Sequence, residues 1–203
     1  MIEAKKVFEE FQKHRGDSIV HVQGTSGHHW NNISTKLNRD ILLEDAMGQS
    51  TSAVFGLALG LPEEKVVHFD TEGALLMNLG VLASIAGKKP KNFVHFLLDN
   101  ECYATTGGQP VPNNEEIDYA MIAKGAGYPV TYNFTDLEEL SIHMQEIMNS
   151  DGPVFVAIKT KPEIENLPMA LRKDHYSRSI SETINDLRSE LNIKWKFKKR
   201  IKW

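Results

Sequence analysis

The chain has 203 residues, 41% of them hydrophobic and 25% charged, which is the composition of an ordinary globular protein with enough length for one domain and a sizeable core. Its formal net charge of −4 argues against a nucleic-acid binder, and its single cysteine excludes both a disulfide framework and a cysteine-ligated iron–sulfur cluster. No apolar run is long enough to span a bilayer, and the charged N-terminus lacks the apolar core of a signal peptide, so we expect a cytoplasmic protein.

The first predicted elements are a helix and a short strand. Apolar residues at Val7, Phe8 and Phe11 have helical spacing and predict a helix over 4–14. A short apolar strand is expected at 18–22. This order of a helix before a strand is the start of the alternation that continues along the chain.

A loop of small and polar residues, 23–32, follows this strand. It lies at the strand's carboxyl end, the edge at which open α/β sheets bind ligands. The hydroxyls of Thr25 and Ser26 are therefore candidate donors to a ligand, although the residues alone favour a turn with local side-chain-to-backbone hydrogen bonds. His28 and His29 are candidate catalytic residues, because adjacent histidines occur in metal sites and acid–base pairs. Neighbours on an extended segment point in opposite directions, so we expect at most one of them to face a ligand.

A segment rich in small residues comes next. Residues 41–43 form a candidate strand, and a helix is expected to open within 45–53 and to run to Leu59. Small residues such as Gly48 let the backbone approach a ligand, or pack the helix tightly on a sheet. From the residues alone, Met47 is a filler of the core, which is the common role of methionine.

The central stretch of the chain predicts two strands joined by a helix. Short apolar strands are expected at 66–69 and 93–98, with a helix over 74–86 between them. Strands joined in this way are parallel, and their carboxyl ends lie side by side at one edge of the sheet. The polar residues that end the two strands should therefore meet.

Oxygen donors stand at both of these strand ends. Glu72 follows the first strand and Asn100 follows the second, and both are hard donors suited to Mg²⁺ or Ca²⁺. Gly73 and Ala74 open the helix, where free N–H groups favour an anion. A divalent ion beside a helix N-terminus suggests a bound diphosphate.

The remainder of the chain continues the alternation. Residues 101–112 form a loop rich in Thr, Gly and Pro, in the place of a lid, and Thr135 is the expected N-cap of a capping box. Helices are expected at 118–126, 136–148 and 179–191, and strands at 130–134 and 154–159. The pattern predicts an α/β fold with an open, mostly parallel sheet and helices on both faces. We expect one domain over 1–203, with 161–203 as a less patterned C-terminal extension and the basic tail 194–202 as a solvated or subunit-contacting terminus.

Several short segments of the central stretch together resemble a known cofactor-binding motif. They are Gly73, 75–80 (LLMNLG), 98–100 (LDN) and 106–110 (TGGQP). They are similar to the thiamine diphosphate-binding motif, which is Gly-Asp-Gly followed some way on by Asn. The version found in sulfopyruvate and phosphonopyruvate decarboxylases is the most similar. The resemblance extends over residues 17–160.

The sequence departs from the family's motif at three positions. Thr71 and Glu72 stand where the family has Gly-Asp, and Ala74 stands where it usually has Ser. The resemblance implies that Mg²⁺ is held by the side chains of Glu72 and Asn100 and by the backbone carbonyl of Cys102. It also implies that the diphosphate lies at the following helix N-terminus, where the missing serine leaves only backbone N–H groups as donors.

The resemblance also gives roles to the two earlier loops. It implies that the loop with Thr25 and Ser26 borders the cofactor and the substrate, which reverses the preference for an ordinary turn. Met47, beside Gly48, becomes the apolar residue that wedges under the cofactor and bends it. The backbone carbonyl of Asp45 would then hold the 4′-amino group of the cofactor.

The implied function is that of a diphosphate-binding, beta-type subunit of a thiamine diphosphate-dependent, non-oxidative 2-oxo acid decarboxylase. The α/β half that supplies the activating glutamate has no counterpart in this sequence. We therefore expect a separate pyrimidine-domain, alpha-type subunit and a hetero-oligomer. A sulfonate or phosphonate on the substrate needs cationic or N–H donors, and Lys36, Arg39 and Arg172 are candidates.

Three alternatives stay open. A carboligase of the acetolactate synthase type would use the same cofactor, and the sequence does not separate the two reactions. The replacement of Gly-Asp by Thr71-Glu72, together with Ala74, is compatible with a non-catalytic homologue. A generic nucleotide-binding α/β domain is disfavoured, because the chain has neither a GxGxxG nor a P-loop Gly-Lys-Ser/Thr motif.

Overall fold

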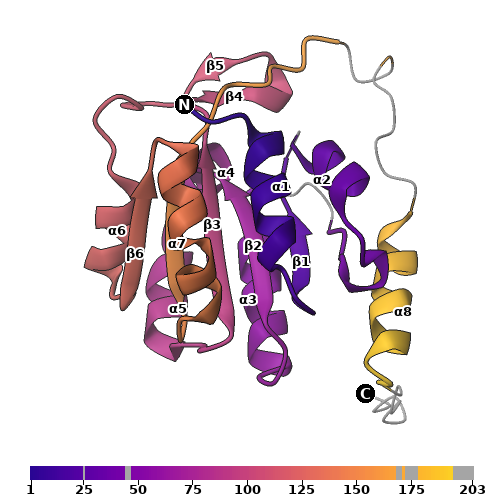
Figure 1. Ribbon diagram of the computed structural model, residues 1–203. Helices are drawn as coiled ribbons and strands as arrows, with labels where there is room; N and C mark the ends of the chain where they lie inside the picture. The colour runs from indigo at the N-terminus through magenta and orange to yellow at the C-terminus, as the bar shows by residue number, and fades with distance from the viewer. Residues whose placement is uncertain (25, 44–46, 168–170, 172–177, 194–203) are drawn as a thin grey trace, which may run out of the picture.

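The computed structural model describes residues 1–24, 26–43, 47–167, 171 and 178–193. Its centre is a five-stranded sheet in which all neighbouring strands are parallel (Figure 1). The strand order is β1 (Ile19–Val22), β2 (Val66–Thr71), β3 (Phe93–Asp99), β7 (Val154–Lys159) and β6 (Val130–Phe134). The predicted α/β fold with an open parallel sheet is thereby confirmed.

The three central strands are buried on both faces. All seven residues of β3 are buried, and so are the first five of β2 and of β7. These strands are almost unbroken runs of β-branched and aromatic residues, the pattern of a parallel sheet covered by helices on both sides. Polar residues that follow the strands are therefore the first that can reach a ligand.

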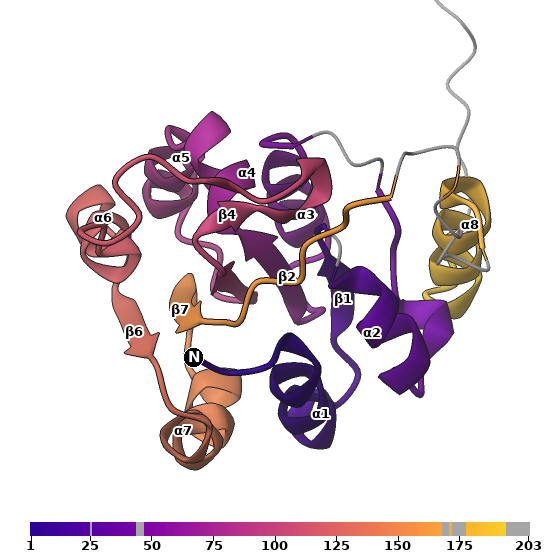
Figure 2. The ribbon, with the colours of Figure 1, turned by 90° about the horizontal axis from the view of Figure 1, so that it is seen from above.

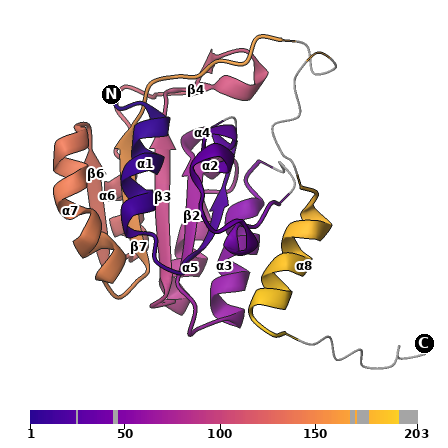
Figure 3. The same cartoon turned by 45° about the vertical axis from the view of Figure 1, so that its right-hand side comes forward.

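Helices cover both faces of the sheet (Figure 2). One core contains residues of α1 (Ala4–His14), α2 (Gly27–Ile33) and α7 (Leu137–Asn149). The core on the other face contains residues of α3 (Ser50–Gly60), α4 (Glu72–Met77), α5 (Val81–Lys88) and α6 (Tyr119–Ala126). The last helix, α8 (Ile180–Glu190), lies beyond β1 against the short 3-10 helix η1 (Leu37–Arg39) (Figure 3). None of the helices in the described ranges has the length and apolarity needed to cross a lipid bilayer.

The predicted strand at 41–43 was wrong. At this point the chain forms one isolated β-bridge, between Val20 and Asp40, and does not continue the sheet. The Leu42 N–H instead donates to the Thr183 hydroxyl of α8 at 3.1 Å. The segment is apolar because it packs between the sheet and α8, and not because it adds a strand.

The predicted helix over 74–86 is broken into two. α4 and α5 are separated by residues 78–80, which include the weak helix formers Asn and Gly. The side-chain amide of Asn78 donates to the Gly48 carbonyl at 2.7 Å. The break therefore fastens α4 to the segment that precedes α3.

Two turns also differ from the prediction. The N-cap of α7 is Asp136 and not Thr135, because the Asp136 carboxylate accepts two backbone N–H groups of the first turn at 2.9 and 3.1 Å. The loop 101–112 contains a small antiparallel hairpin of β4 (Cys102–Tyr103) and β5 (Gln109–Pro110), joined by the 3-10 turn η2. This hairpin stands on the carboxyl edge of the sheet.

A further segment, residues 160–167, crosses the carboxyl edge, and we call it the strap (Figure 2). It starts at the end of β7, where the Thr160 N–H donates to the Asp99 carbonyl at 2.8 Å. Further along, the Glu165 N–H donates to the Ala104 carbonyl at 3.0 Å. The strap is thus attached both to the end of β3 and to the hairpin.

Candidate functional site

The ends of β2 and β3 bring together the three residues that the sequence predicts as metal ligands. Thr71 pairs with Leu98 in the parallel register, so Glu72 and Asn100 follow at neighbouring strand ends. The Cys102 N–H lies 3.1 Å from Glu72 Oε1 and 3.1 Å from Asn100 Oδ1, and it donates to both. Both side-chain oxygens therefore point to the same place, next to the backbone of Cys102.

Glu72 is the most perturbed carboxyl group of this edge. Its side chain is fully buried, and its second oxygen, Oε2, has no hydrogen-bond partner among the described residues. Burial raises the pKa of Glu72 to about 8, the negative charge of Asp99 adds to the rise, and backbone N–H groups oppose it. A cation bound beside this group would favour its charged form.

The donor set fits a small, hard divalent cation. A carboxylate, an amide oxygen and a backbone carbonyl are the kinds of oxygen ligand that Mg²⁺ takes in proteins. The buried Oε2 atom of Glu72 is available for such a bond. The extra methylene of glutamate, relative to the family's aspartate, does not keep the carboxylate away from Asn100, because both side chains already bond the same N–H group.

The residues expected at the diphosphate lie in the first turn of α4. Gly73 and Ala74 are both buried. A Cβ atom on Gly73 would lie 2.8 Å from the Tyr103 ring, so the glycine lets the hairpin pack on α4. A Cβ atom on Gly48, whose φ is +80°, would lie 3.2 Å from the Ala74 carbonyl oxygen. The two glycines therefore allow the hairpin and the segment before α3 to approach the start of α4.

The other residues expected to contact the cofactor differ in burial and in whether the structure describes them. Thr25 and Asp45 lie outside the described residues. Met47 is half-buried and does not belong to the buried core, which argues against its role as a simple core filler. Ser26 is buried, and its hydroxyl donates to Glu163 Oε2 of the strap at 3.4 Å.

His28 and His29 lie on α2 and not on an extended segment. Their ring centroids are 4.0 Å apart, so the expectation that the two side chains point in opposite directions was wrong. The reason is that the helical period replaces the alternation of a strand. His29 Nε2 also lies 2.9 Å from Glu163 Oε1, which joins α2 to the strap.

Two of the predicted cationic residues lie at the opposite end of the sheet. Lys36 Nζ donates to the Gly16 carbonyl at 2.9 Å, and Arg39 Nη1 donates to the Asp17 carbonyl at 2.6 Å. Both acceptors precede the first residue of β1, so neither cation belongs to the carboxyl edge. The third candidate, Arg172, lies outside the described residues.

Lys159 is a cationic residue at the carboxyl edge that the sequence-based reasoning missed. It is the last residue of β7, and its Nζ atom lies 2.9 Å from Asp99 Oδ2 and 2.8 Å from Glu101 Oε1. Its place at the end of a predicted strand was the available signal. The ion pairs partly balance the acidic charge around Glu72.

A row of three buried histidines crosses the sheet below this edge, and it too was missed. His21, His68 and His95 are in register on β1, β2 and β3, and each is at most 2% exposed. The signal was present, because a Val-His pair recurs in all three strands. Burial lowers the pKa of His21 to about 4 and that of His68 well below its ordinary value, so both are neutral near pH 7.

Hydrogen bonds direct this row toward Asp70. The Thr51 hydroxyl donates to Asp70 Oδ2 at 2.7 Å, so the Thr51 oxygen accepts from His68 Nε2 at 3.1 Å. His21 Nδ1 then donates to His68 Nδ1 at 3.1 Å, and His95 Nε2 donates to Asp70 Oδ2 at 3.2 Å. The other oxygen of Asp70 accepts the next backbone N–H at 2.8 Å, at the turn into α4.

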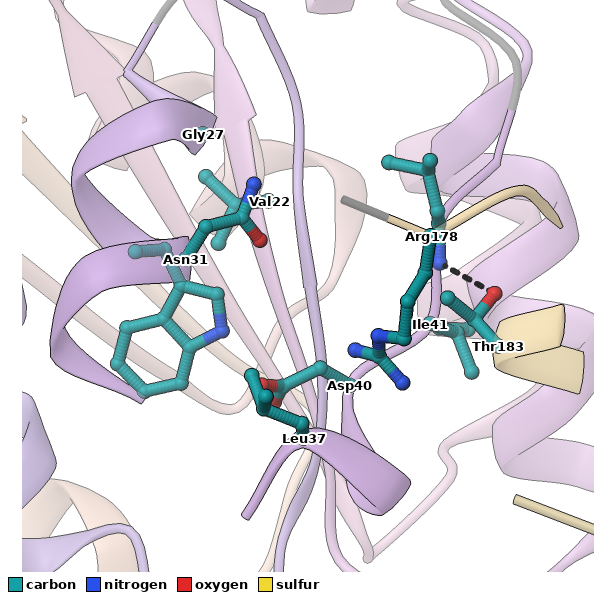
Figure 4. Close-up of a pocket in the computed structure, with 10 residues that line it drawn as sticks. Val22, Gly27, Asn31, Leu37, Asp40, Ile41, Arg178 and Thr183 are labelled. Carbon is teal, nitrogen blue, oxygen red and sulfur yellow. Dashed lines mark hydrogen bonds between the residues drawn. The ribbon is translucent and has the colours of Figure 1, made fainter. Parts of the chain in front are cut away.

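A pocket lies between α2, η1 and α8 (Figure 4). Asn31 lines one wall, Arg178 and Thr183 line the other, and Asp40 lies between them. Asp40 is ion-paired with Arg15 at 2.9 Å. Val22, the last residue of β1, and Gly27 also line this pocket, so it lies beside the carboxyl end of β1, but Glu72, Asn100 and Cys102 do not line it.

The sequence of this chain is similar to those of known thiamine pyrophosphate enzymes. A family model described as "Thiamine pyrophosphate enzyme, C-terminal TPP binding domain" matches residues 25–158. The chain is 37% identical over 131 residues to sulfopyruvate decarboxylase subunit beta of Methanothermobacter thermautotrophicus, a match that covers 64% of this chain and 67% of that one. It is 33% identical over 143 residues to phosphonopyruvate decarboxylase of Streptomyces viridochromogenes, which covers 70% of this chain but 36% of the relative.

A solved structure extends the comparison to the fold. The structure of benzoylformate decarboxylase from Polynucleobacter necessarius superposes with a TM-score of 0.64 at 16% sequence identity. The match covers 80% of this chain and 34% of that one. At this level of identity the likeness concerns the fold alone, and it agrees with the parallel sheet described above.

Proposed function

This chain belongs to the family of C-terminal TPP-binding domains of thiamine pyrophosphate enzymes, and we propose that it is the beta-type subunit of a 2-oxo acid decarboxylase. Thiamine pyrophosphate is another name for thiamine diphosphate. The proposed reaction is the non-oxidative decarboxylation of a 3-sulfo- or 3-phosphono-pyruvate. The names of the sulfopyruvate and phosphonopyruvate decarboxylases among its relatives support this choice of substrate class.

The observation that carries the proposal is the meeting of Glu72, Asn100 and Cys102. In the proposed site, the two side-chain oxygens and the Cys102 carbonyl would hold Mg²⁺, and the ion would hold the diphosphate. The unpartnered, buried Oε2 atom of Glu72 supports a cation at this point. The fully buried Asp70 helps to position Glu72, because its carboxylate accepts the backbone N–H of Thr71, the residue before Glu72.

The bound cofactor supplies the electron sink for decarboxylation, and the residues of this chain bind and orient it. In the proposal, Met47 lies under the cofactor, and Thr25, Ser26 and the Asp45 carbonyl border it. The half-buried state of Met47 is compatible with such a contact. The hairpin and the strap would limit the access of water to the bound cofactor and substrate in this proposal.

A separate alpha-type subunit is part of the proposal. The relatives that bear the name "subunit beta" support it, because a beta subunit has a partner. The partner would supply the pyrimidine-binding domain and the activating glutamate, with active sites between chains. His28 and His29 are proposed to border the substrate on the side of this chain.

Reconstitution tests the proposed function. This chain is mixed with its alpha-type partner, Mg²⁺ and thiamine diphosphate, and the release of CO₂ from sulfopyruvate, phosphonopyruvate and pyruvate is measured. We expect turnover of an acidic 2-oxo acid by the wild type and by Glu72→Asp, which restores the family's residue, and a loss of at least about tenfold in Glu72→Gln. Consumption of no 2-oxo acid by the reconstituted pair would overturn the proposal and favour a non-catalytic homologue.

A further inference from the structure

Two histidines and a carboxylate from distant parts of the chain meet beside the strap. His28 and His29 come from α2 and Glu163 comes from the strap, and one ligand atom of each lies within 4.8 Å of the others. His29 Nε2 and Glu163 Oε1 are 2.9 Å apart. We propose that His28, His29 and Glu163 form a binding site for a divalent transition-metal ion of the zinc type, separate from the proposed Mg²⁺ site.

The ligand set has the chemistry of a transition metal rather than of Mg²⁺. Imidazole nitrogens suit zinc, copper, nickel and iron, whereas Mg²⁺ prefers oxygen ligands. Two histidines and one glutamate are also the protein ligands of a known class of zinc site, which keeps a fourth position open for water or substrate. With metal–ligand bonds of about 2.0–2.2 Å, tetrahedral ligands lie roughly 3.4 Å apart. Small side-chain movements would therefore close the site around an ion.

The surroundings are suited to holding these ligands in place. The side chains of His29 and Glu163 are 23% and 28% exposed, which leaves a path for an ion while keeping most of each side chain packed. The Ser26 hydroxyl donates to Glu163 Oε2 at 3.4 Å, and contacts of this kind orient the carboxylates that bind metals. The His28 and His29 rings already lie 4.0 Å apart, so binding requires little additional ordering.

A second cluster of similar composition is less accessible to a metal ion. His68, Asp70 and His95 also place their ligand atoms within 4.8 Å of one another, but all three are fully buried. Their burial leaves an ion no path from solvent to these ligand atoms, whereas His28, His29 and Glu163 are all partly exposed.

An ion in this site would fasten the strap to α2. His29 and Glu163 are 134 residues apart in the chain, and the strap also bonds the hairpin. Metal binding would therefore restrain the strap across the carboxyl edge. This consequence can be measured as slower proteolytic cleavage of the strap when zinc is present.

The test is a calorimetric titration of ZnCl₂ into the full-length chain after treatment with a chelator, in the absence of thiamine diphosphate. We expect stoichiometric zinc binding by the wild type, weakened at least about tenfold in His29→Ala and in Glu163→Gln. Co²⁺ serves as a second probe, and its visible absorption bands should disappear in the same two variants. Circular dichroism checks that the variants are folded, and Glu163→Gln preserves the size of the side chain.

Three matched variants separate this site from other metal ligands of the chain. His143→Ala removes a half-buried helical histidine whose Nδ1 bonds the Glu139 carbonyl at 2.9 Å. Cys102→Ser removes the thiol, and Glu72→Gln removes the proposed Mg²⁺ ligand. All three should bind zinc as the wild type does. No zinc uptake by the wild type, or equal affinity in the wild type, His29→Ala and Glu163→Gln, would overturn the proposal.

Discussion

Replacing Glu72 by glutamine should stabilise the ligand-free protein while it removes the proposed metal ligand. Glu72 is fully buried, and its pKa is raised from 4.5 to about 8 by burial and by the charge of Asp99. At pH 7 the folded protein therefore holds a proton on Glu72 that the unfolded chain has released. The ordinary pKa of 4.5 lies about 2.5 units below pH 7, and each unit corresponds to about 1.4 kcal/mol. The buried, protonated Glu72 therefore lowers the free energy of unfolding at pH 7 by about 3 kcal/mol.

This loss of stability has a defined pH window. The folded-state pKa of Glu72 lies above the unfolded-state value, so the folded protein binds more protons between pH 4.5 and about 8. Stability therefore falls as the pH rises through this window. Glutamine has no charge to lose, so Glu72→Gln should gain about 3 kcal/mol at pH 7, or about 6–12 °C in Tm for a chain of this length. The gain should shrink to less than about 1 kcal/mol at pH 5.

Urea unfolding at pH 7 and at pH 5, in buffer with EDTA, measures this difference. The matched control is Glu115→Gln, which replaces an exposed glutamate and should change the free energy of unfolding by less than about 0.5 kcal/mol. A Glu72→Gln protein that is less stable than the wild type at pH 7 would refute the reasoning. A gain of equal size at both pH values would refute it as well.

Three further changes test other parts of the structure. The buried His21 has a pKa lowered from 6.5 to about 4, so the unfolded chain binds its proton first and stability should fall by up to about 3 kcal/mol as the pH drops from 6.5 to about 4. His21→Leu, measured by urea unfolding in the Glu72→Gln background, should flatten that fall, and an unchanged slope would contradict the assignment. Asp136→Ala should lower the free energy of unfolding by about 1 kcal/mol through the loss of the N-cap, whereas Thr135→Ala should not. Gly73→Ala would place a Cβ atom 2.8 Å from the ring of the hairpin, so it should displace the hairpin and weaken thiamine diphosphate binding in calorimetry, and equal affinity would exclude that coupling.

The sequence alone was sufficient to predict the parallel sheet and the proximity of Glu72 to Asn100. Buried parallel strands are continuous apolar runs, and β2 and β3 follow that pattern closely. The parallel register then places the residues after both strands at the same edge of the sheet, whatever the packing of the side chains. The apolar segment 41–43 also predicted a strand, but it packs against α8 instead of joining the sheet.

Local sequence patterns could not predict the contacts between segments that are distant in the chain. Nothing near His29 in the sequence indicates Glu163, which lies 134 residues away on the strap. Lys36 and Arg39 were candidates because of their charge alone, and only their contacts with the residues before β1 place them at the other end of the sheet. The buried histidine row depends on the alignment of three strands, so a single strand could not reveal it.

The most direct test of the proposed metal and diphosphate site is calorimetric titration of thiamine diphosphate into this chain, mixed with its alpha-type partner, with Mg²⁺ and with EDTA. We expect binding that requires Mg²⁺ and that weakens at least about tenfold in Asn100→Ala, which removes one of the oxygen donors that meet beside Cys102. Binding of equal strength with Mg²⁺ and with EDTA, or in the wild type and Asn100→Ala, would contradict it.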